Sequence, residues 1–438
     1  MRRKLFGRVY VWEQYVGSPL FIVIILAIIL VPALAGVRHA AQRAQERVHQ
    51  GATKQDLHKR EVIEGISSMA TRNESGSYLL RVVRALELCR GDIPAMQSAA
   101  EEAAKRLAGG GRFFAAGQPS MVSELCGRAG GFMMLKSLTD LTDVRSGDVV
   151  LYTPEPGVAA PGPLHDSGAY VVAFGGDGAQ TARPCFANHA AETYISPTLA
   201  NVIPAWLFTG ELVAALTRLG KMPVMFESIG AYGGNARIAQ YKNGAIAWHE
   251  SHTVPRMAHG VIGNRFLDIV KGMLNRVEAE ERADIDQAGA WAAEAYAHGK
   301  HLYVFSMGHL FPDEVGKTDI GKYFHSDVWN TGFRTSPPPP VTFAPGDAVV
   351  HIGYQHPASE ILRIARPAGA RVAYVTVMRD RDYVNDPEVV WIDPMWPWAD
   401  AVVPLDGYDV PLLAASGIVN GAIAWDIYRV TMEHIKAE

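Results

Sequence analysis

Residues 345–377, "PGDAVVHIGYQHPASEILRIARPAGARVAYVTV", contain the alternation of apolar and helical patterns that most clearly indicates the fold class. A Pro-Gly-Asp turn opens a short apolar run, a helical pattern follows at "SEILRIAR" (359–366), and a second apolar run ends the stretch. Short, continuously apolar strands that alternate with helices are typical of parallel sheets covered on both faces. The stretch therefore predicts an α/β unit built on a parallel sheet.

The same series of elements occurs twice along the chain. In the first half, a helical pattern runs into glycines, a strand-like run and a second helical pattern, "MQSAAEEAAKRLAGGGRFFAAGQPSMVSELCGRAGG" (96–131). In the second half, "IDQAGAWAAEAYAHGKHLYVFSMGHLFPDEVG" (285–316) follows the same order. Each is followed by a strand that a Gly-Asp pair opens, at "SGDVVLYTPEP" (146–156) and at the stretch quoted first. This self-similarity predicts an internal duplication, with a doubly wound α/β unit made twice.

The series "GKHLYVFSMGH" (299–309), helix, "PGDAVVHIGY" (345–354), then "ASEILRIARPAGARVAYVTV" (358–377), resembles the sugar isomerase (SIS) domain, the phosphosugar-binding module of ketose-aldose isomerases and related regulators. The resemblance covers residues 260–438 well and 80–220 more weakly. It implies two flavodoxin-like, three-layer domains with parallel sheets, each with its ligand over the carboxyl ends of the strands. We therefore expect SIS-like domains at 79–220 and 260–438, joined by a linker at 221–259.

The resemblance also places ligand-binding residues in the turns after the strands. In the family, a Ser-x-Ser-Gly-x-Thr-x-Glu loop holds phosphate through hydroxyls and main-chain amides. Residues 353–360, "GYQHPASE", keep only the closing Glu360 of that pattern, although phosphate needs several convergent donors. The expected ligand-binding residues are Ser306, Gly308, His309, Gly353, Gln355, His356, Ser359, Gly117, Ser120, Ser123 and Ser416.

Glu360 and His309 are the candidates for catalysis, and each has a structural alternative. Glu360 fits an acid or base, but a glutamate in the first turn of a helix also complements the helix dipole. His309 either pairs with an anionic or hydroxylated ligand or satisfies the local backbone. Ser416 and Asn420 lie four residues apart on one helical face, which a packing face of small residues explains as well.

We expect no metal and no cofactor. The histidines of "HESH" (249–252) are three residues apart, unlike a helical pair at four, and no third ligand is evident. Three cysteines, Cys89, Cys126 and Cys185, are too few and too scattered for a disulfide framework. We expect all three to be buried, small apolar side chains.

The N-terminus carries a membrane signal. Residues 14–37 have no charged side chain, and 20–37, "LFIVIILAIILVPALAGV", would span about 27 Å as a helix. This predicts a single-pass anchor at 1–37 and a helical stalk at 38–78; a cleaved export signal and a buried helix are the alternatives. Basic residues flank both sides, so charge does not choose the membrane face. Because free sugar phosphates are abundant in the cytosol, we expect the soluble part there.

Composition narrows the function. The chain has 438 residues, 48% of them hydrophobic and 20% charged, and a net charge of −4, which excludes disorder and gives no support for nucleic-acid binding. The resemblance implies a homodimer that binds a sugar phosphate or related carbohydrate derivative. With the N-terminal apolar stretch as an anchor, and because the hydroxyl-rich loop and a recognisable base are missing, we expect a membrane-anchored protein without strong catalysis. An aldose-ketose isomerase and a dimerising scaffold without a ligand are the alternatives.

Overall fold

The computed structural model describes residues 76–154, 164, 166–175, 184–229, 233–250, 254–306, 341–354 and 359–437. The predicted anchor at 1–37 lies outside these ranges, so it stays a prediction. So do Gly308, His309, Gln355, His356 and the side chain of Ser359. Within the described ranges, one helix, α9 (Pro197–Arg218), has the length and hydropathy of a membrane span, but it is entirely buried in the protein and forms part of its core.

The first sheet is parallel throughout and has the strand order β2-β1-β3-β4-β5. Its strands are β1 (Phe113–Gly117), β2 (Lys136–Ser137), β3 (Val149–Thr153), β4 (Tyr170–Phe174) and β5 (Cys185–Phe186). The order 2-1-3-4-5 is that of flavodoxin-like sheets, in which ligands bind beyond the carboxyl ends of the strands. The predicted α/β class with parallel sheets is therefore confirmed.

The second sheet is also parallel, in the order β11-β10-β9-β8. Its strands are β8 (Leu302–Ser306), β9 (Ala348–Ile352), β10 (Arg371–Val375) and β11 (Val389–Ile392). Two antiparallel pairs complete the described strands: β6 (Met222–Pro223) with β7 (His249–Glu250), and β12 (Ala401–Leu405) with β13 (Tyr408–Ala414).

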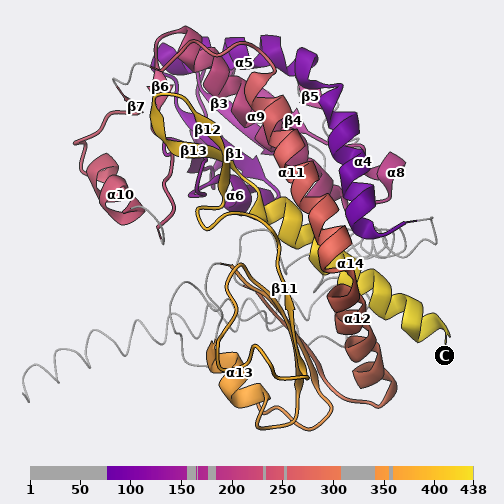
Figure 1. Cartoon of the computed structure of the whole chain (residues 1–438). Coiled ribbons are helices and arrows are strands. Elements are labelled where there is room, and N and C mark those ends of the chain that lie inside the picture. Colours follow the sequence, from indigo (N-terminus) through magenta and orange to yellow (C-terminus); the bar gives the residue numbers. More distant parts are fainter. Residues whose placement is uncertain are drawn as a thin grey trace, which may run out of the picture. The chain divides into compact units, whose positions relative to one another are not determined.

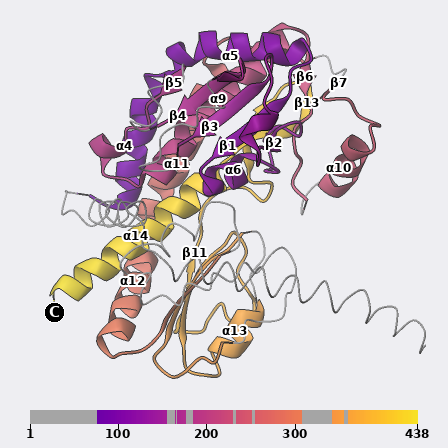
Figure 2. The ribbon, with the colours of Figure 1, turned by 180° about the vertical axis from the view of Figure 1, so that it is seen from behind.

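Both faces of the second sheet are covered, which explains its continuously apolar strands. Alternate residues such as Val304 and Val350 enter the main core on the side of α12 (Arg282–Ala297), whereas Phe305 and Val349 pack with α13 (Ser359–Ala365) on the other side. Figures 1 and 2 show these two helices on opposite faces of the sheet. The arrangement has the three layers expected of the second half.

Of the remaining helices, all but α10 (Gly234–Lys242) pack around the first sheet and between the two sheets, whereas α10 buries only Gly234 and stands apart (Figures 1 and 2). The others are α4 (Tyr78–Arg90), α5 (Ile93–Ala108), α6 (Pro119–Leu125), α8 (Ala190–Thr193), α11 (Val261–Glu280), α14 (Ser416–Ala437) and the 3-10 turn η1 (Leu141–Asp143). The helix α9 begins sharply because Ser196 caps the amide of Leu199 and Pro197 occupies the first turn.

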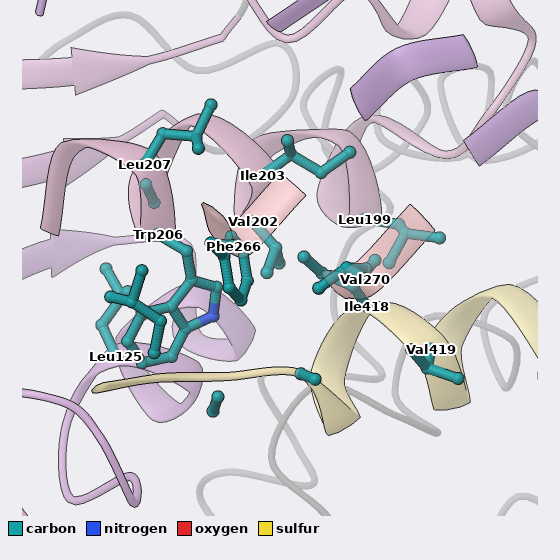
Figure 3. Close-up of a cluster of buried hydrophobic side chains, with 14 of the residues drawn as sticks. Leu125, Leu199, Val202, Ile203, Trp206, Leu207, Phe266, Val270, Ile418 and Val419 are labelled. Carbon is teal, nitrogen blue, oxygen red and sulfur yellow. The ribbon is translucent and has the colours of Figure 1, made fainter. Parts of the chain in front are cut away.

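Helices from the two halves of the chain pack on one another. α4 contacts α11 and α14, and α11 contacts α9. Figure 3 shows side chains of α9 (Trp206), α11 (Phe266) and α14 (Ile418) in one hydrophobic cluster. Residues Val62–Glu438 accordingly form one compact unit. The division into two domains at 221–259 remains a prediction, as does the duplication of sequence.

The prediction that all three cysteines are buried is wrong for two of them. Cys89 is fully buried on α4, but Cys126 is partly exposed and Cys185 is exposed. Cys185 lies on β5 at the edge of the first sheet, where one side of the strand has no neighbouring strand to cover it. An apolar residue in a short edge strand is therefore not a sign of burial.

Candidate functional site

The carboxyl end of β1 meets that of β3 at a close backbone contact. Gly117 has φ +96°, and a Cβ at this position would lie 1.9 Å from the carbonyl oxygen of Thr153. The amide of the next residue, Gln118, donates to that same carbonyl at 2.8 Å. Glycine is needed here because only glycine tolerates both the left-handed backbone and the close approach. The turn brings Gln118 to the tip of the sheet.

Polar side chains from three further positions meet Gln118 and its neighbours at this edge; we call Gln118, Asn188, Thr198 and Asn201 the amide cluster. The side-chain amide of Gln118 donates to Thr198 Oγ1 at 2.6 Å, and Asn188 Nδ2 donates to Asn201 Oδ1 at 2.6 Å. Thr198 and Asn201 lie three residues apart at the start of α9, so they occupy neighbouring positions on its surface. Gln118 Oε1 is buried and has no hydrogen-bond partner among the described residues.

Gly175, directly after β4, has no side chain and so leaves space for the side chains of Asn188 and Asn201. Its φ is +74°, and a Cβ there would lie 1.9 Å from Asn201 Oδ1 and 2.5 Å from Asn188 Nδ2. The Asn188–Asn201 pair therefore sits directly against the bare backbone of Gly175. Amides and hydroxyls that converge at strand tips beside the N-terminus of a long helix can form hydrogen bonds with a polyhydroxylated or anionic ligand.

At the second sheet, the turn after β9 is fixed by hydrogen bonds from three elements. The amide of Gly353 donates to Val375 O at 2.7 Å, Asn420 Nδ2 donates to Gly353 O at 3.1 Å, and Thr376 Oγ1 donates to Tyr354 O at 3.1 Å. Asn420 is held in turn by the indole of Trp396 at 2.9 Å. Hydrogen bonds therefore hold the backbone of Gly353 and Tyr354, the last described residues of this turn.

Beside this turn lies a buried ion cluster, Glu124, Arg128, Tyr354, Asp400 and Ser416. Arg128 is 2% exposed, and its Nη2 lies 3.0 Å from Asp400 Oδ2, 2.5 Å from Ser416 Oγ and 3.6 Å from Glu124 Oε1. Asp400 also accepts from Tyr354 Oη at 2.8 Å and from both the amide and the hydroxyl of Ser416, at 2.8 and 3.0 Å. The cluster joins the end of α6 and the residues after it to β9, β12 and the N-terminus of α14.

One cation faces two carboxyl groups in this cluster, and Arg128 lies nearer to Asp400 than to Glu124. Burial raises the pKa of Glu124 to about 7, Arg128 opposes the rise, and Asp400 adds to it. Burial also disfavours the charge of Arg128, but Glu124 and Asp400 outweigh that effect and hold its pKa above the ordinary value. Glu124 Oε2 has no partner within the described part of the chain, which suits a carboxyl group that keeps its proton near neutrality.

Replacing Glu124 by glutamine is expected to remove a pH dependence of stability. In the unfolded chain this carboxyl ionises near its ordinary pKa of 4.5, whereas in the fold it holds its proton to about pH 7. The stability that this protonation contributes is present below pH 4.5 and is lost as the pH rises to 7, by about 3 kcal/mol at 1.36 kcal/mol per unit. Glu124→Gln stays neutral, so its stability relative to the unsubstituted protein should rise by that amount across this range.

Urea unfolding at pH 4.5 and pH 7.5 measures the difference. Glu102→Gln is the control, because Glu102 is a half-exposed residue that pairs with Arg106 on α5. The control should shift by less than about 0.5 kcal/mol between the two pH values. Equal pH profiles for Glu124→Gln and the unsubstituted protein would contradict the assignment.

The structure places Gly117, Ser306 and Gly353 at strand ends, and Ser120, Ser123 and Ser416 on helices that follow strands. Gly117 and Gly353 lie directly at turns after β1 and β9. Ser120 and Ser123 are on α6, half-buried and exposed respectively. Ser306 ends β8 and is 1% exposed. The hydroxyl of Ser416 both donates and accepts within the ion cluster, so its predicted role at a ligand remains a proposal.

Glu360, the one catalytic candidate that lies within the described residues, forms a helix-surface ion pair. Its Oε1 lies 3.3 Å from Arg363 Nη2, and its side chain is 34% exposed. It lies in the first turn of α13, where a carboxylate complements the helix dipole. The geometry therefore accounts for Glu360 without catalysis, while leaving the residue accessible.

Sequence reasoning missed the amide cluster and the ion cluster. For Thr198 and Asn201 a signal was present, since Ser196-Pro197 marks a helix start at the end of the first half, as Ser416 does at the end of the second. It also missed His351 on β9, which is fully buried and stacks on Tyr374 with ring centroids 4.2 Å apart. Burial lowers the pKa of His351 to about 3, so this ring is neutral.

A cavity of about 390 Å³ lies at the opposite, amino end of β1. Its lining includes Arg112, Phe114, Lys136, Tyr241 and Trp248. Arg112 is bound to Asp148, with Nη2 2.6 Å from Oδ2. The cations of Arg112 and Lys136 could bind an anionic ligand here, so an experiment on ligand binding must distinguish this cavity from the amide cluster.

No protein-family model matches the chain, and no curated protein matches its sequence. Among solved structures, the C-terminal domain of glucosamine-fructose-6-phosphate aminotransferase from Francisella tularensis is 10% identical, with a TM-score of 0.43; the match covers 83% of this chain and 98% of that one. A sugar binding protein from Salmonella typhimurium LT2 is 10% identical, with a TM-score of 0.38 over 82% and 98% of the two chains. Similarity this low carries no argument about function.

Proposed function

We propose that the chain is a membrane-anchored protein with two SIS-like halves that binds a sugar phosphate or related carbohydrate derivative, without strong catalysis. The observation that carries the proposal is the amide cluster at the carboxyl ends of the first sheet. Side-chain amides and hydroxyls are the groups that recognise sugar hydroxyls, because each amide offers both donors and an acceptor. The adjacent N-terminus of α9 adds a favourable field for an anion.

The weak-catalysis part of the proposal rests on the carboxyl groups. An isomerase needs a base that reaches the substrate carbon. Glu124 is 0% exposed in the ion cluster, and Glu360 pairs with Arg363. Aldose-ketose isomerisation remains the second candidate function, because Glu360 is accessible and adjoins the family-like loop at 353–360.

Further parts of the proposal come from the sequence. Residues 1–37 are proposed as the anchor, the soluble part as cytoplasmic, and the protein as a homodimer through its helices. In this proposal the two halves arose by duplication, which agrees with a parallel sheet and a closing 22-residue helix in each half.

Ligand binding can be located with a matched pair of variants. A panel of hexose and heptose phosphates is expected to raise the melting temperature of the full chain in detergent. Gln118→Met keeps the side-chain length and removes both polar atoms, and the loss of about 1–1.5 kcal/mol of hydrogen bonding should weaken binding about tenfold. Lys136→Ala, at the cavity beyond the other end of β1, should leave the affinity unchanged.

The same panel tests the competing functions. Incubation in deuterated water reports isomerisation as solvent deuterium incorporated at C1 of a ketose product or C2 of an aldose product, which a binding protein without strong catalysis should not produce. If Lys136→Ala abolishes the stabilisation and Gln118→Met does not, the ligand binds in the cavity and the amide cluster is not the binding site. If no sugar phosphate stabilises the protein, the dimerising scaffold without a ligand is the remaining hypothesis.

A further inference from the structure

Outside the amide and ion clusters, the turn between α4 and α5 faces the loop after β5 through three side chains with metal-binding atoms. Cys89 Sγ, a carboxylate oxygen of Asp92 and a ring nitrogen of His189 all lie within 4.8 Å of one another. In tetrahedral zinc sites, with bonds of 2.0–2.3 Å, neighbouring ligand atoms are about 3.3–3.8 Å apart. To share one ion, the widest of these separations must shorten by about 1 Å, and the 2.9 Å contact between His189 Nε2 and Asp92 Oδ2 must lengthen slightly.

The hydrogen-bond pattern of His189 points to a cation. Its Nε2 lies 2.9 Å from Asp92 Oδ2, and its Nδ1 lies 3.1 Å from Glu192 Oε1. A neutral imidazole has only one N–H, so carboxylates at both nitrogens require either a protonated ring, which donates from both, or a metal ion at one of them. With a metal ion at Nε2, the neutral ring donates from Nδ1 to Glu192 and shares the ion with Asp92. A carboxylate on the second ring nitrogen is the usual way in which a metal-ligating histidine is oriented.

Cys89 offers a sulfur ligand on the buried side of this group. Its side chain is 0% exposed and is not in a disulfide. A buried free cysteine normally lies among apolar side chains, whereas this sulfur lies within 4.8 Å of a carboxylate oxygen of Asp92 and a ring nitrogen of His189. As a thiolate, together with the Asp92 carboxylate, it would neutralise a divalent cation completely, and a neutral site is the least costly one to hold at a partly buried position.

We propose that Cys89, Asp92 and His189 bind a divalent zinc-class metal ion, with Glu192 as the partner that orients His189. Thiolate, imidazole and carboxylate together suit zinc better than magnesium or calcium, which prefer oxygen ligands alone. Three protein ligands leave one tetrahedral position open. Asp92 is 30% exposed, which gives the ion a route to the site.

The ion would fix the loop that carries part of the amide cluster. Asn188 directly precedes His189, accepts from the amide of Ala190 at 3.0 Å and donates to Asn201. A ligand bond at His189 would thus hold Asn188 in place. This consequence rests on the proposed function, whereas the metal site itself does not.

The test is metal binding by the purified full chain in detergent, with cobalt(II) and zinc(II) as the probes. We expect one equivalent of cobalt, with a near-ultraviolet thiolate-to-cobalt charge-transfer band that zinc abolishes. Cys89→Ser and His189→Ala should remove the band, and Glu192→Gln, a surface substitution that leaves the packing intact, should weaken metal affinity about 10–100-fold. Cys185→Ser is the matched control, because it removes an exposed thiol on β5 and should change nothing.

Circular dichroism verifies that each variant is folded. If Cys89→Ser does not fold, the metal affinity of Glu192→Gln tests the proposal instead. The proposal is overturned by an unsubstituted protein that gives no thiolate band with cobalt, by a band that survives Cys89→Ser, or by Glu192→Gln with unchanged metal affinity. If the unsubstituted protein gives the cobalt band but no sugar phosphate stabilises it, the proposed function is wrong and the metal site stands.

Discussion

Replacing Arg128 by methionine is expected to destabilise the fold by about 3–5 kcal/mol, because it leaves a buried carboxylate without its cation. Arg128 is 2% exposed, and its Nη2 lies 3.0 Å from Asp400 Oδ2, which has no access to water. The substitution also removes the donor to Ser416 Oγ at the N-terminus of α14. Methionine replaces the aliphatic stem of arginine and has no polar atom but ends short of the guanidinium, so the loss combines charge and hydrogen bonding with the vacated volume.

Urea unfolding of the full chain in detergent measures this loss, with Arg145→Met as the matched control. Arg145 is 74% exposed and lies 3.5 Å from Asp143, so the control should cost at most about 1 kcal/mol. In the double variant Arg128→Met with Asp400→Asn, the unpaired charge is gone and part of the stability should return. Equal losses for the two arginines would show that the ion cluster does not hold the two halves together.

The ion cluster shows what the sequence could not reveal. Its members Glu124 and Arg128 are four residues apart, but Asp400 and Ser416 lie more than 270 residues further along the chain. A charged residue in a sequence is more often solvated than buried, and only the contacts between α6, β12 and α14 place these charges together. The periodicity of apolar residues along a sequence reports local structure and carries no information on pairs so far apart.

The sheets, by contrast, follow from local patterns. The Gly-Asp turns before β3 and β9 and the apolar runs after them predict buried parallel strands, and each Asp holds a neighbouring strand: Asp148 accepts from the amide of Arg112 and Asp347 from that of His301, both at 3.0 Å. Gly117 and Gly353 were likewise predicted as strand-end turns. The polar partners at those turns come from distant helices, so the helix start at Ser196-Pro197 marks the position of Thr198 and Asn201 but not their contacts with Gln118 and Asn188.

Replacing Gly175 by alanine is expected to have the other large effect, on both stability and ligand binding. The left-handed backbone alone costs an alanine about 1–2 kcal/mol, and a forced shift of packed neighbours adds about 1–3 kcal/mol. The neighbours are Asn201 Oδ1 and Asn188 Nδ2, which a Cβ would approach to 1.9 and 2.5 Å. Since these two side chains form half of the amide cluster, sugar-phosphate stabilisation should disappear together with about 2–5 kcal/mol of folding free energy.

Gly220→Ala separates the contact from the backbone strain. Gly220 follows α9 with φ +70°, close to the +74° of Gly175, but a Cβ there would meet no atom within 4 Å. The control should therefore show only the backbone cost and keep full ligand stabilisation. Thermal melts of both variants, with and without the sugar-phosphate panel, make the comparison. If Gly175→Ala melts like Gly220→Ala and still responds to the ligand, the Asn188–Asn201 pair does not need the bare backbone at Gly175, and the ligand does not depend on that pair.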